Sequence, residues 1–399
     1  MTVAARRLWL VSNGHAEDLL AAALWSGLAQ RLPGWTATAI PLVGDGRAYV
    51  TAAVTTPLAV VGPRRNLPGG GLTMHHPLLL WRDLRAGILA QTASQWRVLR
   101  AADADAVLIV GDVFAQAMAV ALGAPRRFVL QPLVSVRMAQ GGRWVPWNRA
   151  FMERIRAPER ALLRRAEVVY TRDEPTAAWL RERAVAARYL GNPIMDGLEG
   201  RRLEPWPDLP TVALLPGSRA YAIEAVQVML DALAELADRG RTLAAAVAWT
   251  GPTLPGLPPG WRQEPGTEHG GTVWSRSGVR VAWVAGRFND VLATADAVLG
   301  ATGTAQEQAV GLGLPVVSFA LPPAPGRAFL ANQARLLGPS LEVVPRAPAA
   351  IAAAVARALD DPERRATALR DGPARLGGPG GRDAIAADLL ARLSGSPPA

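Results

Sequence analysis

Short apolar runs alternate with stretches of helical periodicity along this chain, and that alternation limits its fold more than any other feature. In the first half, apolar runs predict strands at Leu8–Asn13, Thr36–Leu42, Leu58–Gly62, Ala106–Val110, Arg127–Leu130, Val168–Thr171 and Ala187–Leu190. Helical patterns separate several of them, at Leu19–Leu32, Pro77–Ala101, Phe114–Leu122, Asn148–Arg165 and Glu174–Arg183. Strands that alternate with helices predict an α/β fold with a parallel, doubly wound sheet.

A second series of the same kind follows the proline-rich stretch Gly191–Pro210. It predicts strands at Thr211–Leu215, Leu243–Trp249, Val279–Val284, Ala297–Gly300 and Val316–Phe319, and helices at Glu224–Arg239, Thr304–Leu312, Ala349–Leu359, Pro362–Arg370 and Arg382–Leu393. The stretch Gly251–Gly271 is rich in Pro and Gly and predicts a loop.

We therefore expect an N-terminal domain over residues 1–190, a linker over residues 191–210 and a C-terminal domain over residues 211–399. The option that the last helices pack back on the N-terminal domain stays open. Two Rossmann-like domains joined in this way are expected to face a cleft. Ligands of such sheets bind at the carboxyl ends of the strands, so the loops that follow strands are the places to search for function.

Composition removes several classes of chemistry. The chain has no cysteine, and its 43 Lys and Arg residues are all arginine. A disulfide framework, a thiol nucleophile, a Schiff-base lysine and a P-loop lysine are therefore excluded. Any phosphate must be held by arginine, by backbone N–H groups or by a helix N-terminus. No apolar run reaches the length of about 18 residues that a membrane-spanning helix needs, so we expect a cytoplasmic protein.

The net charge of +10 is confined to the first half of the chain. Residues 1–190 carry 24 arginines and 13 acidic residues, whereas residues 191–399 carry 19 and 20. A one-sided basic excess favours an anionic partner, either a membrane surface or a phosphorylated substrate. The arginines between Arg126 and Arg188 also fit a solvated helix face. No nucleic-acid-binding motif accompanies them, so we expect no nucleic acid partner.

Two loops of the first half carry candidate catalytic residues. The loop after the first strand contains His15, whose ordinary pKa suits a general base at neutral pH; a loop histidine without chemistry is the alternative. Asp112 follows the strand Ala106–Val110 directly. It is a candidate base, a partner that orients His15, or simply the N-cap of the next helix.

Two loops of the second half suggest a site for a phosphorylated ligand. The turn before Arg219 opens a helix, whose free N–H groups and positive dipole end suit a diphosphate, and Arg219 adds a bidentate partner. An ordinary turn with a surface arginine is the alternative. The later loop Gly300–Gln308 has small residues that let the backbone approach a ligand, and Glu307 could accept hydrogen bonds from a ribose.

These loops carry a family resemblance. The sequence reads LLPGSR at residues 214–219, GNPIMD at 191–196 and GTAQEQ at 303–308, followed by AVGLGLPVV. Together these motifs resemble lipid-A-disaccharide synthase, and the first loop, SNGHAEDL at 12–19, resembles a related family more closely. The resemblance implies a GT-B fold, a UDP-sugar donor held mainly by the C-terminal domain, and transfer to an acceptor without a metal or other cofactor. It also implies an N-terminal domain that faces the acceptor and the membrane.

By position, the resemblance implies that the UDP-sugar is bound by Gly217, Ser218, Arg219, Gly303, Thr304, Glu307, Gln308, Asn192, Asn332 and Gln333. Arg219 would hold the phosphates, and Glu307 or Gln308 the ribose. His15 and Asp112 are the implied catalytic residues, and which of them is the base stays open. The family has a second acid shortly after the first, whereas this chain reads GDVFAQAM at 111–118.

The segment Met74–Trp81, MHHPLLLW, is a separate candidate. Its adjacent His75 and His76 would point apart on a helix, which is a poor geometry for a metal. The leucines and Trp81, followed by Arg82, predict either a helix that contacts a membrane or a buried core helix.

We therefore expect a glycosyltransferase that moves a sugar from a UDP-sugar to a lipid, phosphorylated or other membrane-associated acceptor at an anionic membrane surface. A UDP-sugar 2-epimerase-like isomerase and a non-catalytic nucleotide-sugar or lipid-binding protein are the alternatives. The oligomeric state, including a homodimer, stays open.

Overall fold

The structure is a computed structural model that describes residues 5–65, 67, 77–139, 154–203, 208–218, 221–266, 271–301, 303–321 and 326–395. Arg219, His75 and His76 lie outside these residues. The chain divides into two compact units: Met1–Asp196 with Pro379–Ala399, and Gly197–Gly378. The chain leaves the first unit once and returns to it with residues 379–399.

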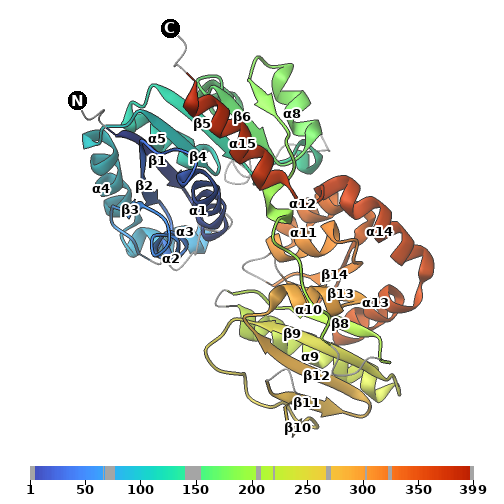
Figure 1. Ribbon diagram of the computed structural model, residues 1–399. Coiled ribbons are helices and arrows are strands. Elements are labelled where there is room, and N and C mark those ends of the chain that lie inside the picture. Colours follow the sequence, from blue (N-terminus) through green and yellow to red (C-terminus); the bar gives the residue numbers. More distant parts are fainter. Residues whose placement is uncertain are drawn as a thin grey trace. The chain divides into compact units, whose positions relative to one another are not determined.

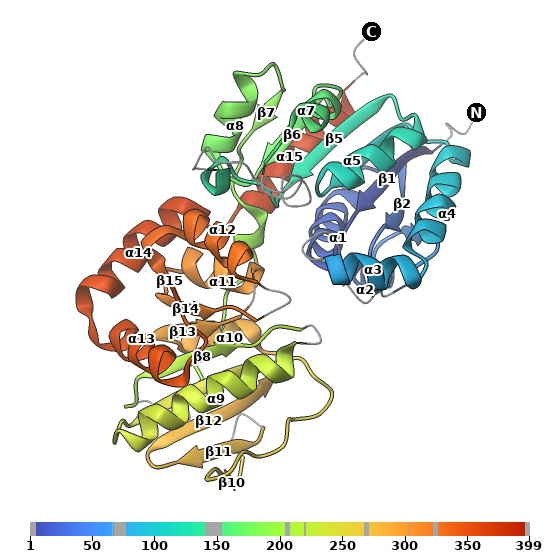
Figure 2. The same cartoon turned by 180° about the vertical axis from the view of Figure 1, so that it is seen from behind.

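The first unit is built on a parallel seven-stranded sheet with the order β3-β2-β1-β4-β5-β6-β7 (Figures 1 and 2). Its strands are β1 (Arg6–Ser12), β2 (Trp35–Pro41), β3 (Leu58–Val60), β4 (Ala106–Val110), β5 (Arg126–Gln131), β6 (Val168–Thr171) and β7 (Ala187–Arg188). Its helices are α1 (His15–Ala29), α2 (Arg47–Ala52), α3 (Pro77–Arg85), α4 (Ile88–Ala101), α5 (Val113–Ala119), α7 (Ala157–Leu163), α8 (Glu174–Arg181) and α15 (Gly381–Ser394). The 3-10 helices are η2 (Val120–Leu122), η3 (Val136–Ala139) and η4 (Pro193–Met195).

Both faces of this sheet are buried, which is why its strands read as continuous apolar runs. In β1, Leu8 and Leu10 pack with α1 and α15 on one face, while Trp9 and Val11 pack toward α4, α5, α7 and α8 on the other. Helix α15 is held to the sheet by Asp388, which accepts hydrogen bonds from Tyr170 Oη of β6 at 2.6 Å and from the Arg188 guanidinium of β7.

The second unit has an eight-stranded sheet with the order β10-β11-β12-β9-β8-β13-β14-β15. Its strands are β8 (Thr211–Leu215), β9 (Leu243–Trp249), β10 (Arg262–Glu264), β11 (Val273–Arg276), β12 (Val279–Ala285), β13 (Ala297–Gly300), β14 (Val316–Phe319) and β15 (Leu341–Val344). Its helices are α9 (Ala222–Asp238), α10 (Phe288–Thr294), α11 (Thr304–Gly311), α12 (Arg327–Leu337), η5 (Gly338–Ser340), α13 (Pro348–Asp360) and α14 (Pro362–Leu376). Without the antiparallel strands β10 and β11, the strand order repeats that of β1 to β6 in the first unit, which has β7 in addition. The expectation of two Rossmann-like domains is confirmed.

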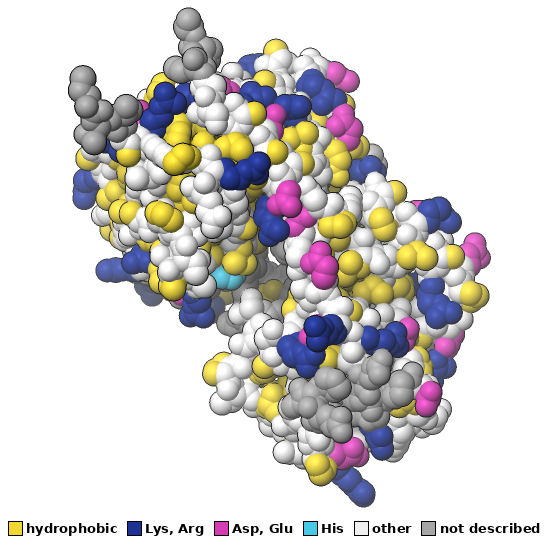
Figure 3. Space-filling model, in the orientation of Figure 1, with side chains coloured by type: hydrophobic (Ala, Val, Ile, Leu, Met, Phe, Trp, Pro, Cys, Tyr) yellow, Lys and Arg dark blue, Asp and Glu magenta, His cyan; other side chains and the backbone are white. Residues whose placement is uncertain are grey.

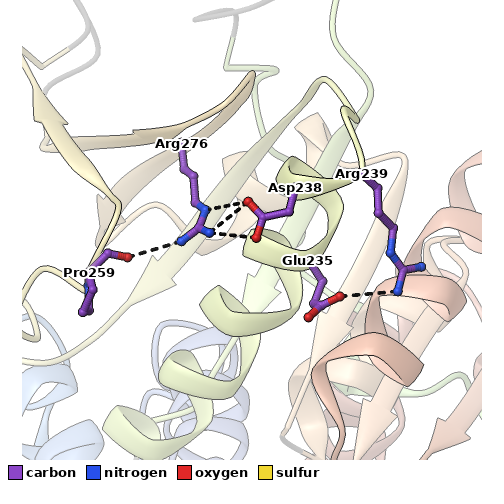
Figure 4. Close-up of polar contacts among 5 residues, drawn as sticks. All are labelled: Glu235, Asp238, Arg239, Pro259 and Arg276. Atoms are coloured by element: carbon purple, nitrogen blue, oxygen red, sulfur yellow. Dashed lines mark hydrogen bonds and ion pairs between the residues drawn. The ribbon is translucent and has the colours of Figure 1, made fainter.

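The structure corrects two sequence-based assignments. The single helix expected over Pro77–Ala101 is two helices, α3 and α4, because Gly87 between them has a positive φ of 90° that interrupts the helix. The loop expected over Gly251–Gly271 contains β10, which pairs with β11 at the sheet edge. This edge is held by Arg276 of β11, which donates from Nη2 to Oδ2 of Asp238 at 2.8 Å at the end of α9 (Figure 4).

Among the described residues, no helix is long and apolar enough to cross a membrane.

Candidate functional site

Asp112, Gly217 and Glu307 follow strands at the place in each sheet where the strand order reverses. In the first unit, β1 pairs with β4 on one side and β2 on the other, and in the second unit β8 pairs with β13 and β9. The loops after β1 and β4, and those after β8 and β13, therefore open side by side. Open α/β sheets bind their ligands at this point.

In the first unit, the loops after β1 and β4 are joined by one hydrogen bond. Asn13 Nδ2 donates to Asp112 Oδ1 at 2.6 Å. The approach depends on Gly111, which has a φ of 142°; a Cβ there would lie 1.8 Å from Asn13 Oδ1. The partner of Asp112 in the first loop is thus Asn13, and an orienting role of Asp112 toward His15 stays a prediction.

Asp112 also caps helix α5, since its Oδ1 accepts from the backbone N–H of Phe114 at 2.9 Å. Burial raises the pKa of Asp112 above its ordinary range, although the hydrogen bonds from Phe114 and Asn13 act in the opposite direction. The capping role foreseen for this residue is confirmed, and it leaves the catalytic role untested. His15 is the first residue of α1 and is exposed.

A second carboxyl group near Asp112 was not foreseen from the sequence. Glu159 of α7 is only 2 % exposed, and its Oε1 accepts from Gln116 Nε2 at 3.1 Å and from Gln131 Nε2 at 2.8 Å. Burial raises the pKa of Glu159 to about 7, and the charge of Asp112 adds to the rise. Gln116 stands four residues after Asp112, where it shares a helix face with it.

A third buried carboxyl group lies behind the first loop. Ser12 Oγ donates to Asp18 Oδ1 at 2.6 Å and is 2.6 Å from Tyr49 Oη, so Tyr49 is left to donate to Ser12. All three side chains are buried. Burial raises the pKa of Asp18 to about 7, and the neighbouring charges of Glu17 and Asp45 act in the same direction.

In the second unit, the loop after β8 exposes backbone next to a helix start. Gly217 has a φ of 95°, and its carbonyl accepts from Thr250 Oγ1 at 3.3 Å. Ser218 is exposed. Helix α9 begins after this loop, and the side chain of its N-cap residue Tyr221 makes no capping hydrogen bond.

The loop after β13 brings two of the predicted residues together. Glu307 of α11 accepts from Gln333 Nε2 of α12 at 3.1 Å, and both side chains are buried. Gly303 lies against α12 as well, because a Cβ there would be 3.0 Å from Phe329 Cζ. Asn332 accepts instead from the Arg335 guanidinium. Thr304 is exposed and Gln308 is half-buried at the start of α11.

Asn192 does not reach a surface in this structure. It is 0 % exposed, and it caps η4 by accepting from the Ile194 N–H at 3.4 Å. Its Nδ2 is buried without a hydrogen-bond partner among the described residues. A contact of Asn192 with a sugar nucleotide stays a prediction.

No family model matches this chain, and no curated protein matches it. Solved structures match over nearly its full length. The glycotransferase of kitacinnamycin is 17% identical, and the match covers 98% of this chain and 99% of the other at a TM-score of 0.61. MurG from Acinetobacter baumannii is 14% identical over 97% and 99%, with a TM-score of 0.57. UDP-GlcNAc 2-epimerase from Neisseria meningitidis, bound to UDP-GlcNAc, is 15% identical over 96% and 100%, with a TM-score of 0.54.

At these identities the likeness shows the fold alone. The chain has the GT-B fold, which glycosyltransferases and UDP-GlcNAc 2-epimerases share. A specific relation to lipid-A-disaccharide synthase is not among these matches and stays a resemblance of motifs.

Proposed function

We propose that this protein is a glycosyltransferase that moves a sugar from a UDP-sugar to a lipid or another membrane-associated acceptor. The observation that carries the proposal is the position of the candidate loops at the two switch points. In the second unit, Glu307 follows β13 and contacts Gln333, and α9 begins after β8, the strand next to β13. In proteins of this fold, that position is where ligands bind.

The proposed reaction needs three contributions. The acceptor hydroxyl loses its proton to Asp112 or His15 and attacks the anomeric carbon of the donor sugar as UDP leaves. Arg219 and the N–H groups at the start of α9 offset the negative charge that develops on the diphosphate. Glu307 or Gln308 holds the ribose. In this proposal the second unit holds the donor and the first unit supplies the base; no metal takes part.

A thermal-shift screen against UDP, TDP, GDP and their sugars tests the donor assignment. Selective binding stabilises the folded state, by about 2.7 kcal/mol when the ligand is at 100 times its Kd. We expect UDP to stabilise the protein most. Arg219→Ala should lose this stabilisation, whereas Arg239→Ala, at the other end of α9, should keep it. Unchanged UDP binding by Arg219→Ala contradicts the proposed phosphate site.

The membrane-associated acceptor is proposed from helix α3. Its side chains Leu78, Trp81 and Leu84 are 40 to 49 % exposed, which a buried core helix would not show. The Arg85 guanidinium lies 4.0 Å from the Trp81 ring centre, and Arg82 is exposed beside it. Figure 3 shows hydrophobic and basic side chains interspersed over the face of the first unit that it displays. An apolar stripe with basic neighbours is typical of a helix that lies on an anionic membrane.

Sedimentation with vesicles that contain phosphatidylglycerol tests this surface. Leu84→Asp and Trp81→Ala should weaken binding, because each removes apolar area from the contact. Leu369→Asp changes a leucine of the second unit that is 66 % exposed and serves as the matched control. Equal binding by all three variants contradicts a membrane role of α3.

The epimerase is the second candidate, because UDP-GlcNAc 2-epimerases share the fold over the same length. An epimerase needs no acceptor. Conversion of UDP-N-acetylglucosamine to a second UDP-sugar without any acceptor would favour it, and release of free UDP that depends on an acceptor would favour the transferase.

A further inference from the structure

The hydrogen bonds around Glu159 leave one buried acceptor unused. Gln131 accepts the backbone N–H groups of Leu133 at 3.1 Å and Val134 at 3.3 Å through its Oε1, so its Nε2 must be the group that points at Glu159. Gln116 also directs its Nε2 to Glu159, but its own Oε1 is buried without a hydrogen-bond partner among the described residues. A buried acceptor without a donor costs about 1 to 3 kcal/mol.

A proton on Glu159 would complete this arrangement. An amide and a carboxylic acid can pair through two hydrogen bonds, in which the amide N–H and the acid O–H each meet the carbonyl oxygen of the other group. Gln116 already makes the first of these bonds. The second requires an O–H on Glu159, and its acceptor would be the unused Gln116 Oε1.

The charges around Glu159 also favour the protonated form. Among the described residues Glu159 has no ion-pair partner, and Arg160 next to it donates to the Ile155 carbonyl at 3.1 Å instead. Helix α7 packs against α5, and Asp112 at the start of α5 is the charged group that acts on Glu159. Asp112 is the better place for a negative charge, because Asn13 and a backbone N–H donate to it at a helix N-terminus.

We propose that Glu159 is a positioning residue for Asp112. Glu159 holds a proton and donates a hydrogen bond through it to Gln116 Oε1, which fixes helix α5. Asp112 remains the ionised carboxyl group of the pair. This role rests on the proposed function of Asp112 as a base. Two carboxyl groups whose surroundings favour different protonation states are a common basis of acid–base chemistry.

Carbon-13 NMR of protein labelled at the glutamate carboxyl carbons tests the proton directly. At pH 6 we expect one resonance of a buried, protonated carboxyl group, and Glu159→Gln should remove it while the same substitution at Glu167, which pairs with Arg126, should not. Asp112→Asn should shift the titration of this resonance to lower pH, since it removes a like charge. An ionised Glu159 at pH 6 overturns the proposal. This experiment needs no enzymatic activity, so its result is independent of the proposed function.

The rate of UDP release from UDP-N-acetylglucosamine tests the positioning role. Glutamine can make both hydrogen bonds of a protonated glutamate, so Glu159→Gln should keep the wild-type rate of UDP release at pH 6. Above about pH 7 the rate of the wild type should decline, whereas the rate of Glu159→Gln should not. Glu159→Ala should lower the rate about tenfold at every pH, as expected when a buried hydrogen-bond pair is lost. Identical pH profiles of the wild type and Glu159→Gln overturn the role. If Glu159→Ala does not fold, the glutamine variant alone decides. If no variant binds UDP, the proposed function fails while the NMR result stands.

Discussion

Asn13 and Asp112 are 99 positions apart in the chain, yet Nδ2 of Asn13 donates to Oδ1 of Asp112 at 2.6 Å. The bond ties the loop after β1 to the loop after β4 at the switch point of the first sheet. It orients the Asp112 carboxyl group and leaves the exposed His15, two residues further on, free of that task. The two candidates for the base can therefore be tested separately.

Asp112→Asn should lower the rate of sugar transfer by two orders of magnitude or more if Asp112 is the base, because general base catalysis contributes about 10² to 10⁴. UDP affinity should change little, since Arg219 and Glu307, which are proposed to hold the phosphates and the ribose, belong to the other unit. Steady-state rates and UDP titration calorimetry measure the two effects. A matching loss of UDP affinity would indicate a structural effect instead.

His15→Ala should cause the same loss if His15 is the base, and a small loss if it only borders the acceptor. The exposed position of His15 predicts little effect on stability, which a thermal melt checks. Wild-type turnover in both this variant and Asp112→Asn would remove both residues from the proposed mechanism.

Gly111→Ala should destabilise the protein much more than Gly123→Ala. Both glycines have positive φ, so alanine at either position costs about 1 kcal/mol or more in backbone strain. At Gly123 nothing lies within 4 Å of the added Cβ, whereas at Gly111 the Cβ would lie 1.8 Å from Asn13 Oδ1. Denaturant unfolding of both variants measures the difference. Equal losses would mean that the two loops are not held as closely as described.

Asp18→Asn should make the stability of the first unit less dependent on pH. The folded protein raises the pKa of Asp18 to about 7, whereas the unfolded chain keeps the ordinary value of about 4. The folded state thus binds the proton more tightly than the unfolded chain does. The stabilisation that this proton gives is complete below about pH 4 and is lost as the pH rises to about 7. This difference between the folded and the unfolded pKa corresponds to about 4 kcal/mol of stability at low pH.

The measurement is the free energy of unfolding at pH 5 and pH 8. The wild type should lose more stability between the two than Asp18→Asn, because the neutral amide has no proton to lose. Asp103→Asn, an exposed site paired with Arg7, is the control and should follow the wild type. If the free energy of unfolding changes by the same amount from pH 5 to pH 8 in the wild type and in Asp18→Asn, a buried, proton-binding Asp18 is contradicted.

Glu307→Ala should weaken UDP binding about tenfold if its carboxyl group holds the ribose, as expected for the loss of a hydrogen bond to a charged group. Gln333→Ala should weaken it less, because Gln333 contacts Glu307 and acts through it. Glu235→Ala, on the surface of α9, is the control. If Glu307→Ala keeps the UDP affinity of the wild type, Glu307 does not hold the ribose, and Gln308 is the next residue to test.

The sequence predicted the parallel core of both sheets well, because strands buried on two faces, such as Ala106–Val110, appear as unbroken apolar runs. It failed at β10, which lies in the stretch rich in Pro and Gly, and at β11, which follows it. These two strands form an antiparallel edge and bury fewer residues. Gly87 interrupts a helical pattern that periodicity alone continues.

The candidate site was predictable where it depends on loops after strands. The positions of Asp112, Gly217 and Glu307 at the switch points follow from that rule. The role of Glu159 was not predictable, because its hydrogen bonds join α5, β5 and α7, and no local pattern reveals which helix faces which strand end. The same holds for Asn13, whose partner is fixed only by the packing of the loops.

Helix α15 returns the chain to the first unit, where Ile385, Leu389 and Leu393 are buried in the core with β1 and α1. During synthesis, the second unit is complete and contiguous before these residues leave the ribosome. The first unit, although most of it is made first, must wait with part of its core uncovered until α15 emerges. The order of folding is therefore expected to reverse the order of synthesis, and the early-made sheet is the part of this protein that most needs protection from aggregation while the ribosome finishes the chain.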